Sequence, residues 1–166
     1  MTDGEKSKII DDMVIICDTR ERKNDHILDY FKENGIKYRI EKLDTADYSM
    51  VFPNYPEIGL DRKILVERKG SLDEICGNLT KDRDRFIREF ERVKDEHLHL
   101  VLENFTWKKI MAGSYRSQFD PKAFTASLLT LSIRYGCQMW FTTPKETPSV
   151  LYGVLYYELR EHLKKF

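Results

Sequence analysis

Two charged residues, Glu67 and Lys69, are separated by one residue in the segment Ile64–Gly70. The segment begins with apolar residues, and the two charged residues lie in its second half. In an extended strand alternate side chains share a face, so the carboxylate and the ammonium would point the same way. Such a pair can hold a divalent cation and steady an attacking water or the charge that develops on phosphorus. The pair alone is also typical of a surface strand ending in a charged turn, so the chemistry depends on matching acids elsewhere.

The first such acid follows a predicted central strand. The apolar run Met13–Cys17 is rich in β-branched residues, which favours a strand buried on both faces, and it ends in Asp18. The charged end of that strand would then lie at the edge of the sheet where open α/β folds place their ligands. Asn24–Asn34 predicts a capped helix, and Ile36–Leu43 predicts a strand near the edge of the sheet.

A second acid, Asp47, opens the next predicted strand. The turn-rich segment Pro53–Gly59 predicts a hairpin-like loop that returns as the strand Lys63–Arg68. This pairing would bring Asp47 beside Glu67 on the neighbouring strand. Carboxylates gathered in this way repel each other unless a cation is bound, and Mg²⁺ favours a few carboxylates together with water and phosphate oxygens.

Beyond Gly70 the pattern becomes helical. Residues 72–76 predict a short turn, Gly77-Asn78 a break, and Lys81–Glu96 a longer helix. On this helix the apolar stripe is formed by Phe86, Phe90 and Val93, and a separate basic stripe by Lys81, Arg85, Arg88 and Arg92. The basic stripe could bind phosphates, or it could be a solvated face, because acidic residues are interleaved with it.

The remaining chain completes an α/β pattern. The expected elements are a strand at His97–Glu103, a short helix at Phe105–Met111, a helix from Asp120-Pro121 to Gly136, a strand at Cys137–Thr142, and a last helix over about 149–165. His97 and His99 are interpreted as structural, with no third ligand nearby. The last helix is apolar on more than one side, which indicates either a homodimer contact or a peripheral helix with amphipathic tyrosines.

The length and amino-acid composition limit the classes of protein to which the chain can belong. The chain has 166 residues, which fits one domain with a polar N-terminal tail over residues 1–11. Its 28 basic and 28 acidic residues cancel, so nucleic-acid binding must come from local patches. Three widely spaced cysteines predict small buried residues, not disulfides or zinc ligands. With no signal core or membrane-length run, we expect a soluble intracellular protein in the cytoplasm, associated with nucleoid or nucleus.

These residues together resemble a known family. Asp47 followed by Glu67-x-Lys69 is similar to the metal signature of the PD-(D/E)xK nucleases, which have the restriction-endonuclease-like α/β fold, a mixed central sheet flanked by helices. More narrowly, the chain from Val14 onward resembles the XPF-type structure-specific endonuclease domain. The matching segments are Asp18-Thr19-Arg20-Glu21, Ala46-Asp47-Tyr48, Val66-Glu67-Arg68-Lys69, Asp73 and Arg85-Phe86.

The resemblance implies a DNA endonuclease that depends on Mg²⁺ or Mn²⁺, is commonly dimeric, and cuts branched or junction DNA in repair, recombination or replication. It implies metal ligation by Asp18, Asp47 and Glu67, with Lys69 positioning water or charge and Arg20 contacting phosphate or holding an acid. Glu21 and Asp73 are second-rank candidates for the active site. DNA binding would fall to the basic stripe and Arg68, although strand alternation turns Arg68 away from Glu67 and also fits a structural tie.

The chain departs from the family in three respects. Members usually carry glycine where this chain has Ala46, and the segment Lys81–Phe86 matches the family's Asp-Gly-Arg-aromatic motif only loosely. Cellular members also usually add a helicase domain, a helix-hairpin-helix module, or both. Its size resembles free-standing versions encoded by phages or mobile elements. Alternatives are a non-catalytic DNA-binding or scaffold subunit, a Holliday-junction resolvase and a restriction-like duplex nuclease. The sequence leaves open the DNA structure, the cleavage polarity, the oligomeric state, the partner and the number of metal ions.

Overall fold

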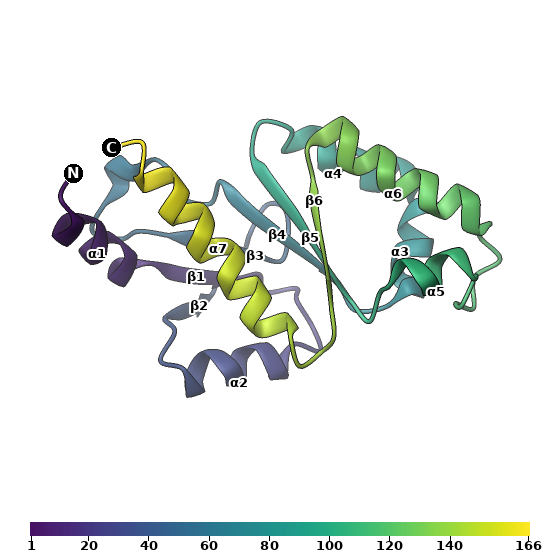
Figure 1. Cartoon of the computed structure of the whole chain (residues 1–166), viewed down its shortest axis with the longest axis horizontal. Coiled ribbons are helices and arrows are strands. Elements are labelled where there is room, and N and C mark those ends of the chain that lie inside the picture. Colours follow the sequence, from purple (N-terminus) through teal and green to yellow (C-terminus); the bar gives the residue numbers. More distant parts are fainter. The chain divides into compact units, whose positions relative to one another are not determined.

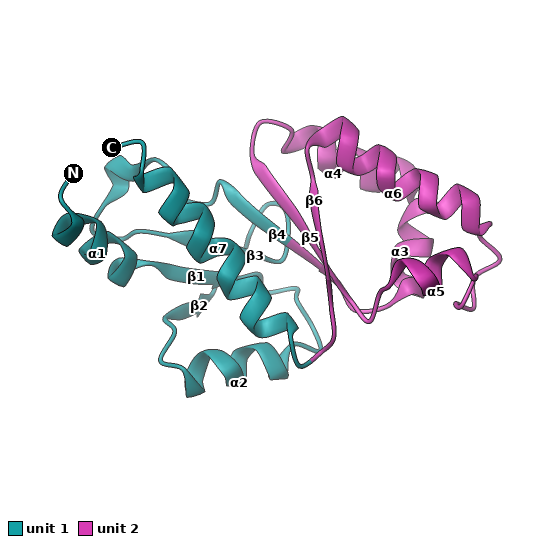
Figure 2. Cartoon of the chain, in the orientation of Figure 1, with its two compact units in different colours: residues 1–66, 145–166 teal, residues 67–144 magenta.

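The computed structural model describes residues 1–166, and strands and helices are interspersed along the whole chain (Figure 1). It divides into two units, residues 1–66 with 145–166 and residues 67–144 (Figure 2). The elements of the first unit are α1 (Asp3–Asp12), β1 (Val14–Cys17), α2 (Asp25–Glu33), β2 (Tyr38–Ile40), β3 (Tyr48–Val51), the 3₁₀ turn η1 (Pro56–Ile58) and α7 (Thr147–Leu163). Strand β4 (Ile64–Lys69) runs from the first unit into the second, which holds α3 (Leu72–Leu79), α4 (Arg83–Arg92), β5 (His97–Glu103), α5 (Trp107–Met111), α6 (Pro121–Tyr135) and β6 (Gln138–Thr142).

The strands form a mixed six-stranded sheet in the order β2-β1-β3-β4-β5-β6. Strand β1 pairs parallel with β2 and antiparallel with β3, which in turn pairs antiparallel with β4. Strand β5 pairs parallel with β6. The predicted mixed sheet flanked by helices is therefore confirmed, as is the hairpin that joins β3 to β4.

In the first unit the core follows from hydrophobic patterning. All four residues of β1 are buried, as a central strand covered on both faces requires. Helix α7 contacts both α1 and α2 (Figure 1), and seven of its residues are buried, while Tyr157 is 58% exposed. Much of the apolar surface of α7 is thus covered by its own chain. None of the helices is both long enough and apolar enough to cross a membrane.

In the second unit the helices α3, α4, α5 and α6 pack with one another (Figure 1). The predicted apolar stripe of α4 is confirmed, because Phe86 and Phe90 are each 2% exposed and their rings meet edge to face at 5.0 Å. Helix α6 begins at the predicted cap, where Asp120 accepts a hydrogen bond from Ala123 N, and it ends at Gly136 in the left-handed conformation.

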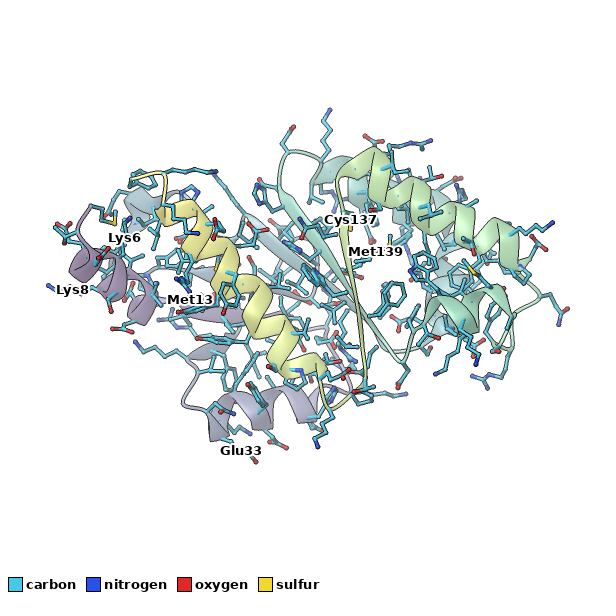
Figure 3. All side chains as sticks on the ribbon, viewed as in Figure 1. Lys6, Lys8, Met13, Glu33, Cys137 and Met139 are labelled. Carbon is cyan, nitrogen blue, oxygen red and sulfur yellow. The ribbon has the colours of Figure 1, made fainter.

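The three cysteines are buried and free, as predicted. Burial raises the pKa of Cys17 to about 11 and that of Cys137 to about 12, so neither is a reactive thiolate at neutral pH. Cys137 lies next to β6 with Met139 close by, whereas Lys6, Lys8 and Glu33 lie on helices of the first unit (Figure 3).

Four predicted elements differ from the structure. The N-terminal residues, predicted to be a polar tail, form helix α1. The helix begins with a capping box, in which the side chains of Thr2 and Glu5 each accept a hydrogen bond from the other residue's backbone N–H. The predicted break at Gly77 is wrong, since α3 continues to the buried Leu79. Helix α4 is shorter than predicted, and Lys81 lies in the turn before it.

The predicted edge strand ends early, at Ile40. Beyond that residue, Glu41 N still bonds Cys17 O at 3.0 Å, but Leu43 N is taken by the Asp18 carboxylate at 2.6 Å. A side chain therefore replaces the next ladder partner and ends the strand. Asn24 does precede α2, yet its side chain accepts no hydrogen bond from the N–H groups of the helix; its Nδ2 instead donates to Tyr48 Oη and Cys17 Sγ.

Candidate active site

In the first unit the backbone of Asp47 is fixed between two strand ends. Asp18 N donates to Asp47 O at 2.8 Å, and Asp47 N donates to Val66 O at 3.1 Å. Asp47 is thereby bonded both to Asp18, the residue that follows β1, and to Val66, the residue that precedes Glu67 in the chain. These bonds come from the antiparallel pairing of β3 with its two neighbours.

The Asp18 carboxylate is buried and fully engaged. Its Oδ1 accepts from Arg20 N at 2.8 Å and Arg20 Nε at 2.7 Å, and its Oδ2 accepts from Leu43 N at 2.6 Å and Arg20 Nη2 at 3.3 Å. Burial acts to raise the pKa of Asp18, but the bonds from Arg20 and Leu43 outweigh it and hold that pKa below its usual range. The second-rank acid Glu21 is half-buried, and its N–H donates to Asp18 O at 3.1 Å.

Ala46, which stands before Asp47, has a φ of 67°, in the left-handed region. An L-residue there is strained by about 1–2 kcal/mol, because its Cβ approaches the following carbonyl oxygen. A glycine would carry no such strain. The turn ahead of Asp47 is therefore formed by a residue that suits it less well than glycine would.

In the second unit Glu67 and Lys69 form a close ion pair. Lys69 Nζ lies 2.7 Å from Glu67 Oε1, and the side chains of Lys69 and Glu67 are 9% and 16% exposed respectively. The ammonium also lies 5.4 Å from the centre of the Phe86 ring on α4. The predicted sharing of one strand face by the two side chains is confirmed by this contact.

Two further acids, Glu74 and Glu89, gather near this pair, and neither is among the residues predicted from the sequence. Glu74 Oε1 lies 3.6 Å from Lys69 Nζ, and Glu74 Oε2 accepts from Gly70 N at 3.0 Å. The signal for Glu74 was its place three residues after the helix cap Ser71, as in a capping box.

Glu89 lies one helical turn after Phe86, so it shares the face of α4 that meets Lys69. Burial, followed by the charge of Glu67, raises the pKa of Glu89 above its usual range. A raised pKa means that the folded protein disfavours the ionised form of Glu89. Ionisation of Glu89 therefore lowers the free energy of unfolding.

We expect Glu89→Gln to raise the melting temperature at pH 7 in EDTA. Because the folded pKa is raised, stability is lost as pH climbs from the unfolded pKa through the folded one, and glutamine removes that loss. The gain should vanish at pH values below both pKa values. Melting curves at several pH values measure it, with Asp95→Asn, an exposed acid after α4, as the control. A variant less stable than wild type at pH 7 would contradict the prediction.

Arg68 points away from the Glu67 pair. It is 8% exposed, and its Nη1 lies 3.3 Å from Glu103 Oε1 on β5, itself 6% exposed. Burial of this guanidinium argues against the predicted contact with DNA phosphate and favours the alternative role of a structural tie. Strand alternation anticipated this orientation.

Asp73 also serves the local structure. Its carboxylate accepts from Arg116 N at 2.8 Å, Arg116 Nε at 3.0 Å and Ser117 N at 3.2 Å, and so fastens the loop between α5 and α6. The bond from the Arg116 side chain is the main cause that lowers the pKa of Asp73.

The basic stripe of α4 is retained in part. Arg85, Arg88 and Arg92 are exposed on the helix, and Arg85 lies 3.6 Å from Asp82. Lys81 is exposed but precedes the helix, so it belongs to the turn and not to the stripe.

Within each unit, no group of three or more His, Cys, Asp or Glu side chains is placed to hold a metal ion by itself. The donor set nevertheless fits Mg²⁺, which in phosphoryl-transfer enzymes uses one or two carboxylates with water and substrate phosphate. Asp47 in the first unit and Glu67 in the second are each carboxylates of this kind, and Oε1 of Glu67 accepts from Lys69 Nζ at 2.7 Å.

Comparisons with known proteins show the fold and the family of the chain. No curated protein matches the chain. Among solved structures, XPF from Aeropyrum pernix matches with a TM-score of 0.65 and 19% identity over 87% of this chain, and the same protein in complex with DNA matches with a TM-score of 0.63 and 19% identity over 89%. The chain spans 61% and 66% of the length of those two chains, and these likenesses show the fold. The family model of the ERCC4 domain matches residues 17–154, so the chain belongs to the ERCC4 domain family.

Proposed function

We propose that this chain is a divalent-metal-dependent DNA endonuclease in which Asp47, Glu67 and Lys69 act together. The observation that carries the proposal is the Glu67–Lys69 pair at 2.7 Å, held largely out of solvent against Phe86 in a chain of the ERCC4 family. The backbone bond from Asp47 to Val66, the residue covalently joined to Glu67, supports the inclusion of Asp47.

In the proposed reaction water attacks a DNA phosphodiester and leaves 3′-hydroxyl and 5′-phosphate ends. Bound Mg²⁺ or Mn²⁺ would lower the pKa of that water and neutralise phosphate charge. Lys69 donates to Oε1 of Glu67, so the carboxylate is oriented before substrate arrives. The ammonium of Lys69 is itself held by Glu67 and by the Phe86 ring, and it can donate to the oxygen on which charge develops.

The substrate we propose is DNA with a branch or junction, bound in part by the arginines of α4. A panel of labelled flap, fork, splayed-arm, four-way and plain duplex DNAs, each with and without Mg²⁺, tests this proposal. Cleavage near branch points would support it, preference for the four-way DNA would favour a Holliday-junction resolvase, and equal cleavage of duplex would favour a restriction-like nuclease. Binding without cleavage under any metal would favour a non-catalytic DNA-binding subunit.

Replacing Arg85, Arg88 and Arg92 together by glutamine should weaken DNA binding and flatten its dependence on salt. Each phosphate that the variant no longer neutralises is expected to lower the slope of log K against log salt by about 0.9. Fluorescence anisotropy at several salt concentrations measures it. The matched control replaces three exposed lysines of the first unit by glutamine and so removes the same charge; these are Lys8, Lys32 and Lys165. An unchanged slope in the α4 variant would count against the arginine stripe.

A homodimer through α7 is part of the proposal, though the structure narrows the surface that it would use. Most apolar residues of α7 are buried within its own chain, and Tyr157 is the large exposed one. Sedimentation at micromolar concentration should show a dimer that Tyr157→Glu weakens. A wild-type protein that sediments only as a monomer would remove the dimer.

A further inference from the structure

The Asp18 carboxylate has no room for another ligand. Four N–H donors reach it, two on each oxygen, at 2.6 to 3.3 Å, and its side chain is 1% exposed. A carboxylate oxygen has two lone-pair sites, so both oxygens are saturated. To reach either oxygen a cation would have to displace Arg20 or leave the buried Leu43 N–H without its acceptor, which is costly.

Unlike the buried side chain of Asp18, the side chain of Arg20 is exposed to solvent. Its side chain is 62% exposed although two of its nitrogens are bound to Asp18, and its Nη2 also donates to Leu43 O at 2.7 Å. The guanidinium is therefore held on one edge by a buried fork and by a backbone carbonyl. A planar guanidinium fixed in this way is suited to bind a phosphate, because little side-chain freedom remains to be lost on binding.

We propose that Asp18 is a positioning residue that holds Arg20 toward a DNA phosphate, and that it is not a ligand of the catalytic metal. This inference rests on the proposed function. It divides the acids by role: Asp18 acts through Arg20, whereas the proposed function assigns cation binding to Asp47 and Glu67. Leu43 completes the arrangement, since its N–H and its C=O bind the acid and the arginine of the same pair.

The test compares Asp18→Asn, Arg20→Gln and their double variant with Asp47→Asn. Two readouts are taken without cleavage: DNA affinity in Ca²⁺ by anisotropy, and Mn²⁺ binding to the protein by electron paramagnetic resonance. Removal of one charge-assisted hydrogen bond to phosphate should weaken DNA binding about tenfold in both single variants, and the double variant should lose no more than either. Mn²⁺ affinity should stay within about twofold for Asp18→Asn and fall at least tenfold for Asp47→Asn.

A loss of Mn²⁺ affinity in Asp18→Asn equal to that in Asp47→Asn would overturn the proposal, as would additive losses of DNA affinity in the double variant. Arg20→Lys, which keeps the charge but not the fork, should recover less than half of the lost affinity, and full recovery would also overturn it. Should Asp18→Asn fail to fold, Arg20→Gln with its exposed side chain keeps the DNA readout. A wild-type protein that binds Mn²⁺ and DNA but cleaves nothing would refute the proposed function alone.

Discussion

Glu67→Gln should lower the rate of DNA cleavage at saturating Mg²⁺ by about 10³-fold or more, while DNA binding stays within about threefold of wild type. Glutamine keeps the size of the side chain but removes the negative charge that a cation requires. It also removes the ion pair that fixes Lys69, so two parts of the proposed catalytic group are lost at once. Single-turnover cleavage of the preferred branched DNA measures the rate, and anisotropy in Ca²⁺ measures binding.

The matched control for Glu67→Gln is Glu74→Gln. Glu74 is also an acid near Lys69 Nζ, at 3.6 Å, but its side chain is 47% exposed. Glu74→Gln should lower the rate of DNA cleavage by no more than about 10–100-fold, as for residues that only orient a catalytic group. Asp47→Asn should behave as Glu67→Gln does. If Glu67→Gln or Asp47→Asn cleaves branched DNA with Mg²⁺ as fast as wild type, the assignment of the catalytic acids fails.

The parts of the fold that the sequence predicts are those in which one local rule acts alone. The run Met13–Cys17 has no polar interruption, so its burial on both faces follows from composition. Asp120-Pro121 and Gly136 mark both ends of α6, because capping and the left-handed cap depend only on neighbouring residues. The capping box at Thr2 and Glu5 was equally local, and the same rule would have predicted α1.

Where a distant group competes for the same atoms, the local rule fails. Asn24 is a good helix cap by type, but its Nδ2 donates to Tyr48 Oη and Cys17 Sγ, and its side chain accepts no N–H from α2. Residues 41–43 have strand-like alternation, but the Asp18 carboxylate takes the N–H of Leu43. Gly77 predicts a break, yet burial of Leu79 and its neighbours keeps α3 helical. Each outcome depends on a partner far away in the chain.

The candidate site divides in the same way. Alternation along one strand was enough to place Glu67 with Lys69 and to turn Arg68 away from them, because the period of a strand is fixed. The acids Glu74 and Glu89 come from helices, so their approach to the pair depends on how α3 and α4 pack in the second unit. The family resemblance gave Asp18 the same predicted role as Asp47, and the four donors around Asp18 are the reason for the different role that we propose for it.

Arg68→Met should lower the free energy of unfolding by about 3–5 kcal/mol, because it removes the guanidinium that forms an ion pair with the buried Glu103 carboxylate. Both side chains are less than a tenth exposed and their charged atoms are 3.3 Å apart, so solvent cannot replace the interaction that the variant removes. The double variant Arg68→Met with Glu103→Leu should recover most of the loss, since a buried ion pair replaced by apolar residues is often neutral. Urea unfolding followed by circular dichroism measures all three proteins.

The exposed pair of Lys32 with Asp29 provides the contrast for this prediction. Its atoms lie at a similar distance, 3.4 Å, but both side chains are 62% exposed, so Lys32→Met should cost less than about 0.5 kcal/mol. Equal costs for Arg68→Met and Lys32→Met would show that burial of Arg68 does not matter. Failure of the double variant to recover stability would place the cost in the packing of the arginine stem. Recovery of stability with unchanged DNA affinity would assign Arg68 to the structure of the sheet and leave DNA binding to the exposed arginines of α4.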